Sequence, residues 1–196
     1  MAFTPLQLAR TVADIRACTL CEPHLPLGAN PIVQADPAAR IVLVSQAPGR
    51  IAHEQSVPYL DPSGRRLRDW LGVDEETFYG SGRFVVFPMG FCFPGKGKGG
   101  DLPPRPECAP TWHERLWAAL PPSRLTLLIG GYAQERYLGE RRRRTLTETV
   151  RHYRDYLPEY LPLPHPSPRN NIFLARNPWI EAEVLPELRE RVADLL

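Results

Sequence analysis

The sequence predicts an α/β fold, in the form of a three-layer α/β/α sandwich around a mostly parallel central sheet of about four strands. Several short runs are almost continuously apolar and rich in β-branched residues, without the alternation of a half-exposed strand, which indicates strands buried on both faces. These runs alternate with segments of helical spacing, as in parallel strands joined by crossover helices. The chain has 196 residues and no linker-like tract, so we expect a single domain over residues 1–196.

Each predicted element has a local signal. Leu8, Val12 and Ile15 stand at helical spacing near the N-terminus, and Gly72 follows a second segment of that kind. The run IVLV followed by SQAPG indicates a buried strand that ends in a turn. In chain order, the expected elements are a helix (5–17), a strand with its turn (41–49), a helix (62–73), a strand (83–92), a polar loop (95–108), a helix (111–120), a strand (125–131), a helix (132–139), an extended proline-rich segment (160–170) and a closing helical segment (177–196).

The composition excludes several classes of protein. Apolar residues make up 43% of the chain and charged residues 23%, ordinary values that argue against disorder. No apolar run approaches the roughly 20 residues that span a bilayer, and the N-terminus lacks the pattern of a secretory signal. We therefore expect a cytoplasmic protein without a membrane partner. The net charge of +2 is too small to indicate a nucleic-acid partner, and the 23 prolines lie between the apolar runs rather than in one tract.

The loops that follow the predicted strands are the expected place for chemistry, because ligands bind beyond the carboxyl ends of strands in such sheets. Three loops qualify, with the sequences SQAPG (45–49), FCFPGKGKGG (91–100) and HPSPRN (165–170).

The four cysteines are candidate ligands. Cys18 and Cys21 form a C-x-x-C pair, and Cys92 and Cys108 lie far downstream. Without a sign of secretion, structural disulfides are disfavoured, and a thioredoxin-like pair should follow a strand, which this pair does not. Four thiolates can hold zinc or an iron–sulfur cluster, and spacing alone does not choose between these or two buried thiols with an incidental pair. A site here would clamp the N-terminal helix to the loop at 93–107.

Taken together, these motifs resemble the uracil-DNA glycosylase superfamily. Residues 46–49, followed at matching spacing by Tyr59, are similar to the first motif of the iron–sulfur family 4 enzymes, as is the arrangement of cysteines. Residues 127–139 resemble the family's central strand–helix unit. Residues 165–170 are closer to the single-strand-selective monofunctional uracil-DNA glycosylases. The resemblance implies a 4Fe-4S cluster on the four cysteines, with zinc or no metal as the alternatives.

The resemblance implies a monofunctional DNA glycosylase that hydrolyses the N-glycosidic bond of uracil, or of another deaminated base, to begin base excision repair. Such an enzyme extrudes the base into a pocket. Tyr59 would stack on the base; the alternative is an ordinary half-buried tyrosine. His165, as neutral imidazole, would donate a hydrogen bond to the base oxygen on which negative charge develops. We expect a monomer that acts on uracil-containing DNA near the bacterial nucleoid.

Further roles are implied residue by residue. Ser167 would contact a phosphate or brace its loop, and Pro168, Arg169 and Asn170 would enter the DNA where the base has left. Prolines such as Pro166 would stiffen this segment by fixing φ. The base would be contacted by residues of two loops, namely Gln46, Ala47, Met89 and Gly90.

The sequence also departs from family 4. Gln46 and His53 stand where those enzymes carry acidic residues; Gln46 can orient water but cannot take its proton. His53 could activate water if neutral, or could be an exposed loop histidine. Glu54 and Asp61 are carboxylates close enough in sequence to substitute.

Pro88 stands where family 4 carries the asparagine that reads the uracil edge, so base recognition must rely on other groups. We therefore expect a broader range of deaminated bases. These losses also admit two other hypotheses, a catalytically silent relative that binds damaged DNA and an enzyme that captures its abasic product covalently.

Basic residues could bind phosphate locally. Lys96 and Lys98 lie in a loop expected to face DNA, whereas Arg141–Arg144 are expected to be solvated surface charge. Arg65, Arg66 and Arg68 could line the same phosphate path.

Overall fold

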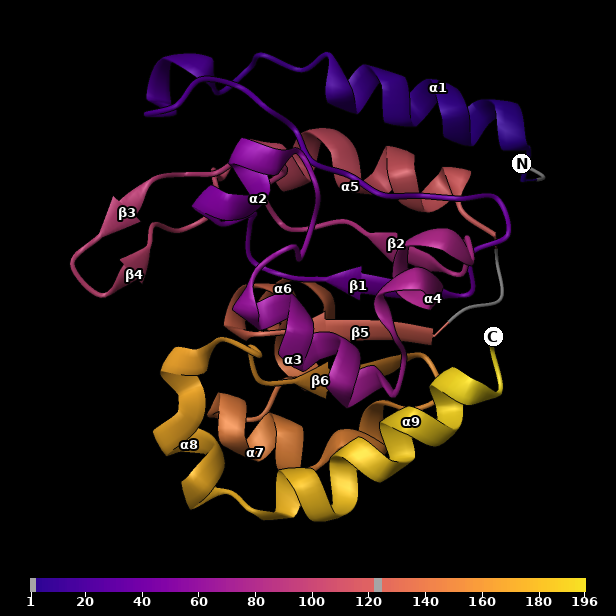
Figure 1. Cartoon of the computed structure of the whole chain (residues 1–196), viewed down its shortest axis with the longest axis vertical. Helices are drawn as coiled ribbons and strands as arrows, with labels where there is room; N and C mark the ends of the chain where they lie inside the picture. Colours follow the sequence, from indigo (N-terminus) through magenta and orange to yellow (C-terminus); the bar gives the residue numbers. More distant parts are fainter. Residues whose placement is uncertain (1–2, 122–124) are drawn as a thin grey trace.

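A computed structural model describes residues 3–121 and 125–196 and has a four-stranded sheet at its centre (Figure 1). The strand order is β2-β1-β5-β6, and each pairing of neighbouring strands is parallel. The predicted α/β class and the mostly parallel four-stranded sheet are therefore confirmed. The strands are β1 (Ile41–Val44), β2 (Phe84–Val86), β5 (Leu125–Ile129) and β6 (Tyr160–Leu163).

Side chains of each strand alternate between two apolar cores, one on each face of the sheet. Val42 and Val44 of β1 pack into one core, whereas Ile41 and Leu43 pack into the other. All four residues are buried. Because both faces are covered, the strands show no polar alternation in the sequence.

Helices cover both faces, which completes the three layers (Figure 1). One face carries α1 (Pro5–Arg16), α5 (Cys108–Ala119) and α6 (Gly131–Leu138). The opposite face carries α3 (Pro62–Leu71), α4 (Glu75–Gly80), α7 (Leu146–Arg151) and α9 (Leu185–Ala193). Within residues 3–121 and 125–196, no helix combines the length and the apolar character needed to cross a membrane.

Local capping explains where the helices begin and end. The side chain of Thr4 accepts a hydrogen bond from the amide of Gln7 (3.2 Å) at the start of α1, and Asp61 does the same for the amide of Gly64 (2.9 Å) in α3. Gly72 takes a left-handed conformation (φ 71°) and ends α3, as predicted.

The structure differs from the sequence prediction in its shortest elements. The predicted polar loop at 95–108 contains a hairpin of β3 (Lys96–Gly97) and β4 (Gly100–Asp101), and α5 begins at Cys108 instead of residue 111. The predicted extended segment at 160–170 ends in a 3-10 turn (Pro168–Asn170). The sequence does not predict helices α2 (Arg50–Gln55), α4, α7 and α8 (Asn171–Arg176), and the predicted closing helical segment at 177–196 includes a π-helical turn (Ile180–Val184) before α9. Elements of two to six residues are too short to show a hydrophobic period.

The topology brings the loops after several strands to one edge of the sheet. From the central strand β1 the chain moves to β2 on one side, whereas β5 and β6 lie on the other side. Loops that leave the carboxyl ends of neighbouring strands in opposite directions open a binding crevice between them. The loops after β1 and β6, together with α2 and α8, lie at this edge (Figure 1).

Candidate active site

The three loops expected to carry chemistry contact one another at the carboxyl edge of the sheet. Gln46 Nε2 donates a hydrogen bond to the carbonyl oxygen of Leu102 (3.0 Å), which connects the β1 loop to the strand that leaves the hairpin. Arg169 Nη1 reaches the carbonyl oxygen of Gly99 (3.5 Å), which connects the HPSPRN loop to the hairpin tip. The hairpin therefore lies between the two motif loops.

His165 follows β6 and is held as a neutral imidazole. Its Nδ1 accepts a hydrogen bond from the amide of Ser167 (3.1 Å), so Nδ1 carries no proton and Nε2 does. Burial lowers the pKa of His165, although the carboxylates of Asp61 and Asp101 act in the opposite direction. Asn170 Nδ2 donates to the carbonyl oxygen of His165 (2.7 Å). The ring can therefore offer Nε2–H as a hydrogen-bond donor.

Arg66 of α3 braces this loop. Its guanidinium donates to the carbonyl oxygens of Pro166 (3.4 Å) and Ser167 (3.0 Å) and to Oδ1 of Asn171 (2.6 Å). The sequence places Arg66 among the residues that could line a phosphate path. In the structure the Arg66 guanidinium instead bonds groups of the protein itself and fixes the loop that carries His165.

Tyr59 lies between α2 and α3 in a left-handed conformation (φ 57°). Its ring meets Phe78 edge-on, with 6.4 Å between centroids. The hydroxyl group is buried and has no hydrogen-bond partner of regular geometry within the described residues, although the nearby side chain of Ser45 acts to lower its pKa. Burial raises the pKa of Tyr59. Because the residue as a whole is only half-buried, the part that stays accessible belongs to its ring or to its backbone.

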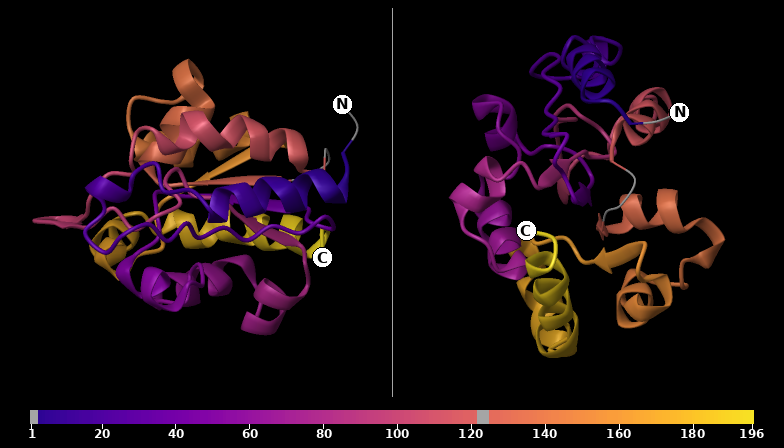
Figure 2. Two further views of the ribbon diagram at one scale, coloured as in Figure 1. Left: turned by 90° about the horizontal axis from the view of Figure 1, so that it is seen from above. Right: turned by 90° about the vertical axis from the view of Figure 1, so that its right-hand side faces the viewer.

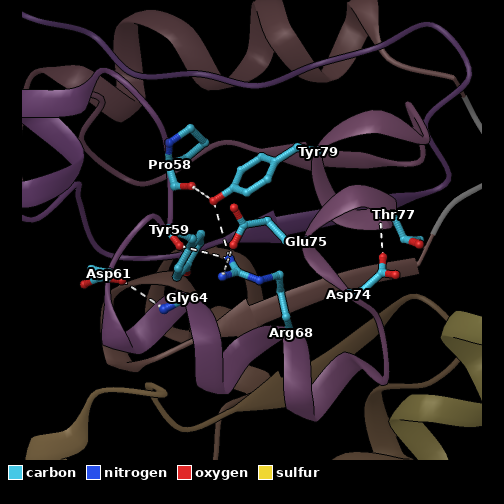
Figure 3. A network of polar contacts seen from close by, with 9 residues as sticks. All are labelled: Pro58, Tyr59, Asp61, Gly64, Arg68, Asp74, Glu75, Thr77 and Tyr79. Carbon is cyan, nitrogen blue, oxygen red and sulfur yellow. Dashed lines mark hydrogen bonds and ion pairs between the residues drawn. The ribbon is translucent and has the colours of Figure 1, made fainter.

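Helix α3 fixes the backbone of Tyr59 (Figure 3). Arg68, with a side chain only 8% exposed, donates from Nη1 to the carbonyl oxygen of Tyr59 (3.2 Å) and pairs with Glu75 (2.9 Å). The hydroxyl of Tyr79 donates to the carbonyl oxygen of Pro58 (2.8 Å). Like Arg66, Arg68 therefore acts inside the protein and not on a phosphate path.

Three of the residues considered for water activation differ in the hydrogen bonds and ion pairs that they already make. His53 lies on α2, and its buried Nδ1 has no hydrogen-bond partner within the described residues. Glu54 pairs with Arg50 on the surface (3.0 Å). Asp61 uses one carboxylate oxygen to cap α3, which fixes its orientation and leaves the other oxygen available.

Asp101 is a third carboxylate near the site, and none of the motifs in the sequence includes it. Its Oδ2 lies 3.6 Å from where a Cβ on Gly49 would stand, and its charge raises the pKa of His165. Gly-rich sequence around a short polar stretch is the signal of a tight hairpin that could have revealed it. Two carboxylates, Asp61 and Asp101, therefore influence the His165 imidazole.

The groups expected to read the base are already partly engaged. The amides of Met89 and Gly90 donate to the carbonyl oxygens of Ser45 (2.7 Å) and Gln46 (3.0 Å). Gln46 Nε2 also uses one of its two N–H groups to bond Leu102, so its side chain has the acceptor Oε1 and the second N–H left to offer. Recognition through the amides of Met89 and Gly90 would require these bonds to break.

The four cysteines line one pocket, which also includes Trp112. Burial raises the pKa of Cys92 to about 11 and that of Cys108 to about 12. The sulfur of Cys108 accepts a hydrogen bond from the amide of Phe91 (3.3 Å). No group of three or more His, Cys, Asp or Glu within residues 3–121 and 125–196 forms a ready metal-ion site. The four thiols and the amide donor nevertheless fit an iron–sulfur cluster, which is larger than a single metal ion and would be bound by the sulfurs as thiolates.

The carboxyl edge of the parallel sheet therefore presents a Pro-Gly turn, a half-buried tyrosine and a histidine held neutral. Residues 32–189 match the family model of the uracil DNA glycosylase superfamily. The chain belongs to this superfamily, as the sequence resemblance predicted, and is a DNA glycosylase in the general sense. The matched region contains Cys92 and Cys108 but begins after Cys18 and Cys21.

Proposed function

We propose that the protein is a monofunctional glycosylase that releases uracil, or a related deaminated base, from DNA by hydrolysis. The observation that supports this most directly is the bond from the Ser167 amide to His165 Nδ1 (3.1 Å). This bond dictates a neutral ring with its proton on Nε2. A neutral donor is suited to a departing base, because it stabilises the developing negative charge without a proton transfer.

Different residues would act in successive steps of the reaction. The base is extruded and stacks on the ring of Tyr59. The N-glycosidic bond breaks, its electron pair leaves with the base, and His165 Nε2–H stabilises the resulting anion. Water then attacks the sugar carbon and gives its proton to a carboxylate, for which Asp61 and Asp101 are the candidates beside His165. Gln46 Oε1 and His53 can orient the water or the base.

An oligonucleotide assay tests this proposal. A single- or double-stranded oligonucleotide with one uracil is incubated with the protein and then treated with alkali, which cuts the strand at an abasic site. We expect cleavage after alkali and none before it. Intact strands on both substrates would contradict the proposal. Parallel reactions with hypoxanthine and xanthine define the base range, which the absence of a side-chain donor or acceptor at Pro88 leads us to expect to be broad.

His165→Ala should lower the single-turnover rate by orders of magnitude. His152→Ala is a matched control, because this exposed histidine bonds the carbonyl of Glu148 within α7 and belongs to none of the site loops. An unchanged rate for His165→Ala would remove the residue from the mechanism.

We further propose that Cys18, Cys21, Cys92 and Cys108 hold a 4Fe-4S cluster. When bound, such a cluster would act structurally, since its ligands come from the end of α1, the region before the hairpin and the start of α5. Anaerobically purified protein should absorb at about 400 nm and contain iron and sulfide. A colourless protein with stoichiometric zinc would support the zinc alternative, and Cys108→Ser should lose whichever metal is bound.

A catalytically silent damage-binding relative is the second candidate function. The engaged amides of Met89 and Gly90 favour it, because they limit recognition of a base edge. Such a protein would bind abasic or uracil-containing DNA in the same assay without releasing base.

A further inference from the structure

The β3–β4 hairpin projects from the body of the protein beside the candidate active site. Figure 2 (left) shows it extending beyond every other element on that side of the molecule. Lys96 pairs with Asp101 and Gly97 with Gly100 in its short antiparallel ladder, and residues 96–99 and 101 are exposed. This hairpin buries no apolar surface of its own, so packing within the protein does not explain its presence.

The hairpin carries every lysine of the chain. Among 24 basic residues, lysine occurs only at positions 96 and 98. Neither lysine forms an ion pair with any residue that the structure describes. The nearest acidic residue along the hairpin is Asp101, which stands opposite Lys96 in the ladder. Two cations without an ion pair among the described residues therefore extend into solvent.

Unlike the two lysines, arginines of the surface run 141–144 form ion pairs with acidic residues. Arg141 pairs with Glu159 (3.7 Å), Arg142 with Glu135 (3.9 Å) and Arg143 with Asp155 (2.7 Å). Their charge is compensated locally, as expected of a solvated face.

The hairpin is attached to one motif loop at its base and to the other at its tip. The Leu102 amide donates to the carbonyl oxygen of Gly95 (2.9 Å), and the carbonyl of Leu102 accepts from Gln46. At the tip, the guanidinium of Arg169 lies against the backbone, and a Cβ on Gly100 would stand 2.6 Å from its Nη1. The hairpin is therefore fixed relative to the loop that carries His165.

We propose that this hairpin is a DNA-binding arm in which Lys96 and Lys98 hold backbone phosphates next to the nucleotide from which the base is released. This inference rests on the proposed glycosylase function for its choice of ligand. Lysine ammonium groups bind phosphate as point charges, and the glycines on either side of each lysine let a sugar-phosphate backbone approach the hairpin closely. The arm would place positive charge directly at the DNA, although the net charge of the whole protein is only +2.

The test compares two variants that carry the same change in charge. Lys96→Ala/Lys98→Ala removes the arm's cations, and Arg142→Ala/Arg143→Ala removes two compensated ones. The dissociation constant for a duplex that contains a non-hydrolysable abasic-site analogue is measured across a range of salt concentrations. The slope of log K against log salt should decrease in magnitude by about 1.8 for the arm variant, about 0.9 for each phosphate that a lysine no longer neutralises, and remain unchanged for the control.

A charge-conserving variant, Lys96→Arg/Lys98→Arg, should restore most of the wild-type slope. Since the lysines occur nowhere else, an amine-acetylating reagent provides a second measurement: both side chains should be protected when the duplex is bound. A wild-type slope for the alanine variant, or full acetylation in the complex, would overturn the proposal.

The experiment separates the arm from the glycosylase activity, because binding to the analogue requires no base release. If the arm variant changes the slope but the wild-type protein releases no uracil, the arm stands and the glycosylase proposal fails. If uracil is released but the slope is unchanged, the arm is wrong and the glycosylase stands.

Discussion

A Cβ atom on Gly64 would lie 1.6 Å from the carbonyl oxygen of Tyr59. The third residue of α3 thus lets the preceding chain pass directly over the helix, and the carbonyl of Tyr59 occupies the space of the missing side chain (Figure 3). Arg68 then donates to that same oxygen, and the backbone of Tyr59 is held at φ 57°. The position of the proposed stacking ring is therefore set by a glycine and a buried arginine on one helix.

Gly64→Ala tests this relationship. An alanine within a helix normally stabilises it by about 1 kcal/mol relative to glycine. Here the clash with backbone should reverse the sign, so that the free energy of unfolding falls by more than about 1 kcal/mol and the single-turnover rate falls at least about tenfold. Gly80→Ala is the matched control, because a Cβ there meets nothing within 4 Å. Equal stability and activity of Gly64→Ala and the wild type would show that Tyr59 is not held in this way.

Arg66 and Arg65 offer a second matched pair on the same helix. Arg66→Ala removes the donors to Pro166, Ser167 and Asn171, whereas Arg65 is exposed and makes none of these bonds. Loss of the brace should lower the single-turnover rate and admit water to His165, which would move the acid limb of the pH–rate profile to higher pH. Arg65→Ala should leave rate and profile unchanged. A slower Arg66→Ala enzyme with an unshifted profile would point to a general loss of stability instead.

The sequence was sufficient to predict the parallel sheet and most of the long helices. The reason is that the apolar runs and the spacing of residues such as Val12 and Ile15 reflect burial directly. It also indicated that the loops at Gln46 and His165 would lie together, since parallel strands share a carboxyl edge. The hairpin could not be predicted in the same way: Lys96–Asp101 buries nothing, so no hydrophobic period marks it.

The roles of individual polar residues were harder to predict. Arg66 and Pro166 are 100 positions apart, and the sequence around Arg66 reads as surface charge. Likewise, Asp101 comes near His165 only because the hairpin is attached to two other loops. Such roles depend on contacts between distant segments, which local spacing does not encode.

The activity should depend on pH through His165. Burial lowers the pKa of this imidazole below its usual value of 6.5, so the ring stays neutral at pH values where an exposed histidine would begin to gain a proton. The single-turnover rate should therefore hold from neutral pH to somewhat below pH 6.5 and fall only at lower pH, as the cationic ring breaks its bond with the Ser167 amide. A rate that already halves at pH 6.5 would contradict this assignment.

A second buried histidine, His113, should make stability depend on pH. Its Nε2 lies 3.1 Å from the carbonyl oxygen of Pro88, which can only accept, so Nε2 carries the proton. Its Nδ1 must then accept from the hydroxyl of Tyr137 (2.6 Å), whose oxygen accepts from Trp117 Nε1 (2.7 Å). The network needs a neutral ring, and burial lowers the pKa of His113 to about 4.

Between pH 4 and 6.5 the unfolded chain binds a proton at His113 that the folded protein does not. The corresponding stability is present in full above pH 6.5 and is lost as the pH falls toward 4, by about 3 kcal/mol in total. In urea unfolding at several pH values, His113→Gln should lose this part of the pH dependence, whereas His24→Gln, on the surface, should retain it. Comparing each variant with the wild type cancels the contributions of other groups, His165 included. Parallel curves for His113→Gln and the wild type would mean that His113 is not held neutral in the folded protein.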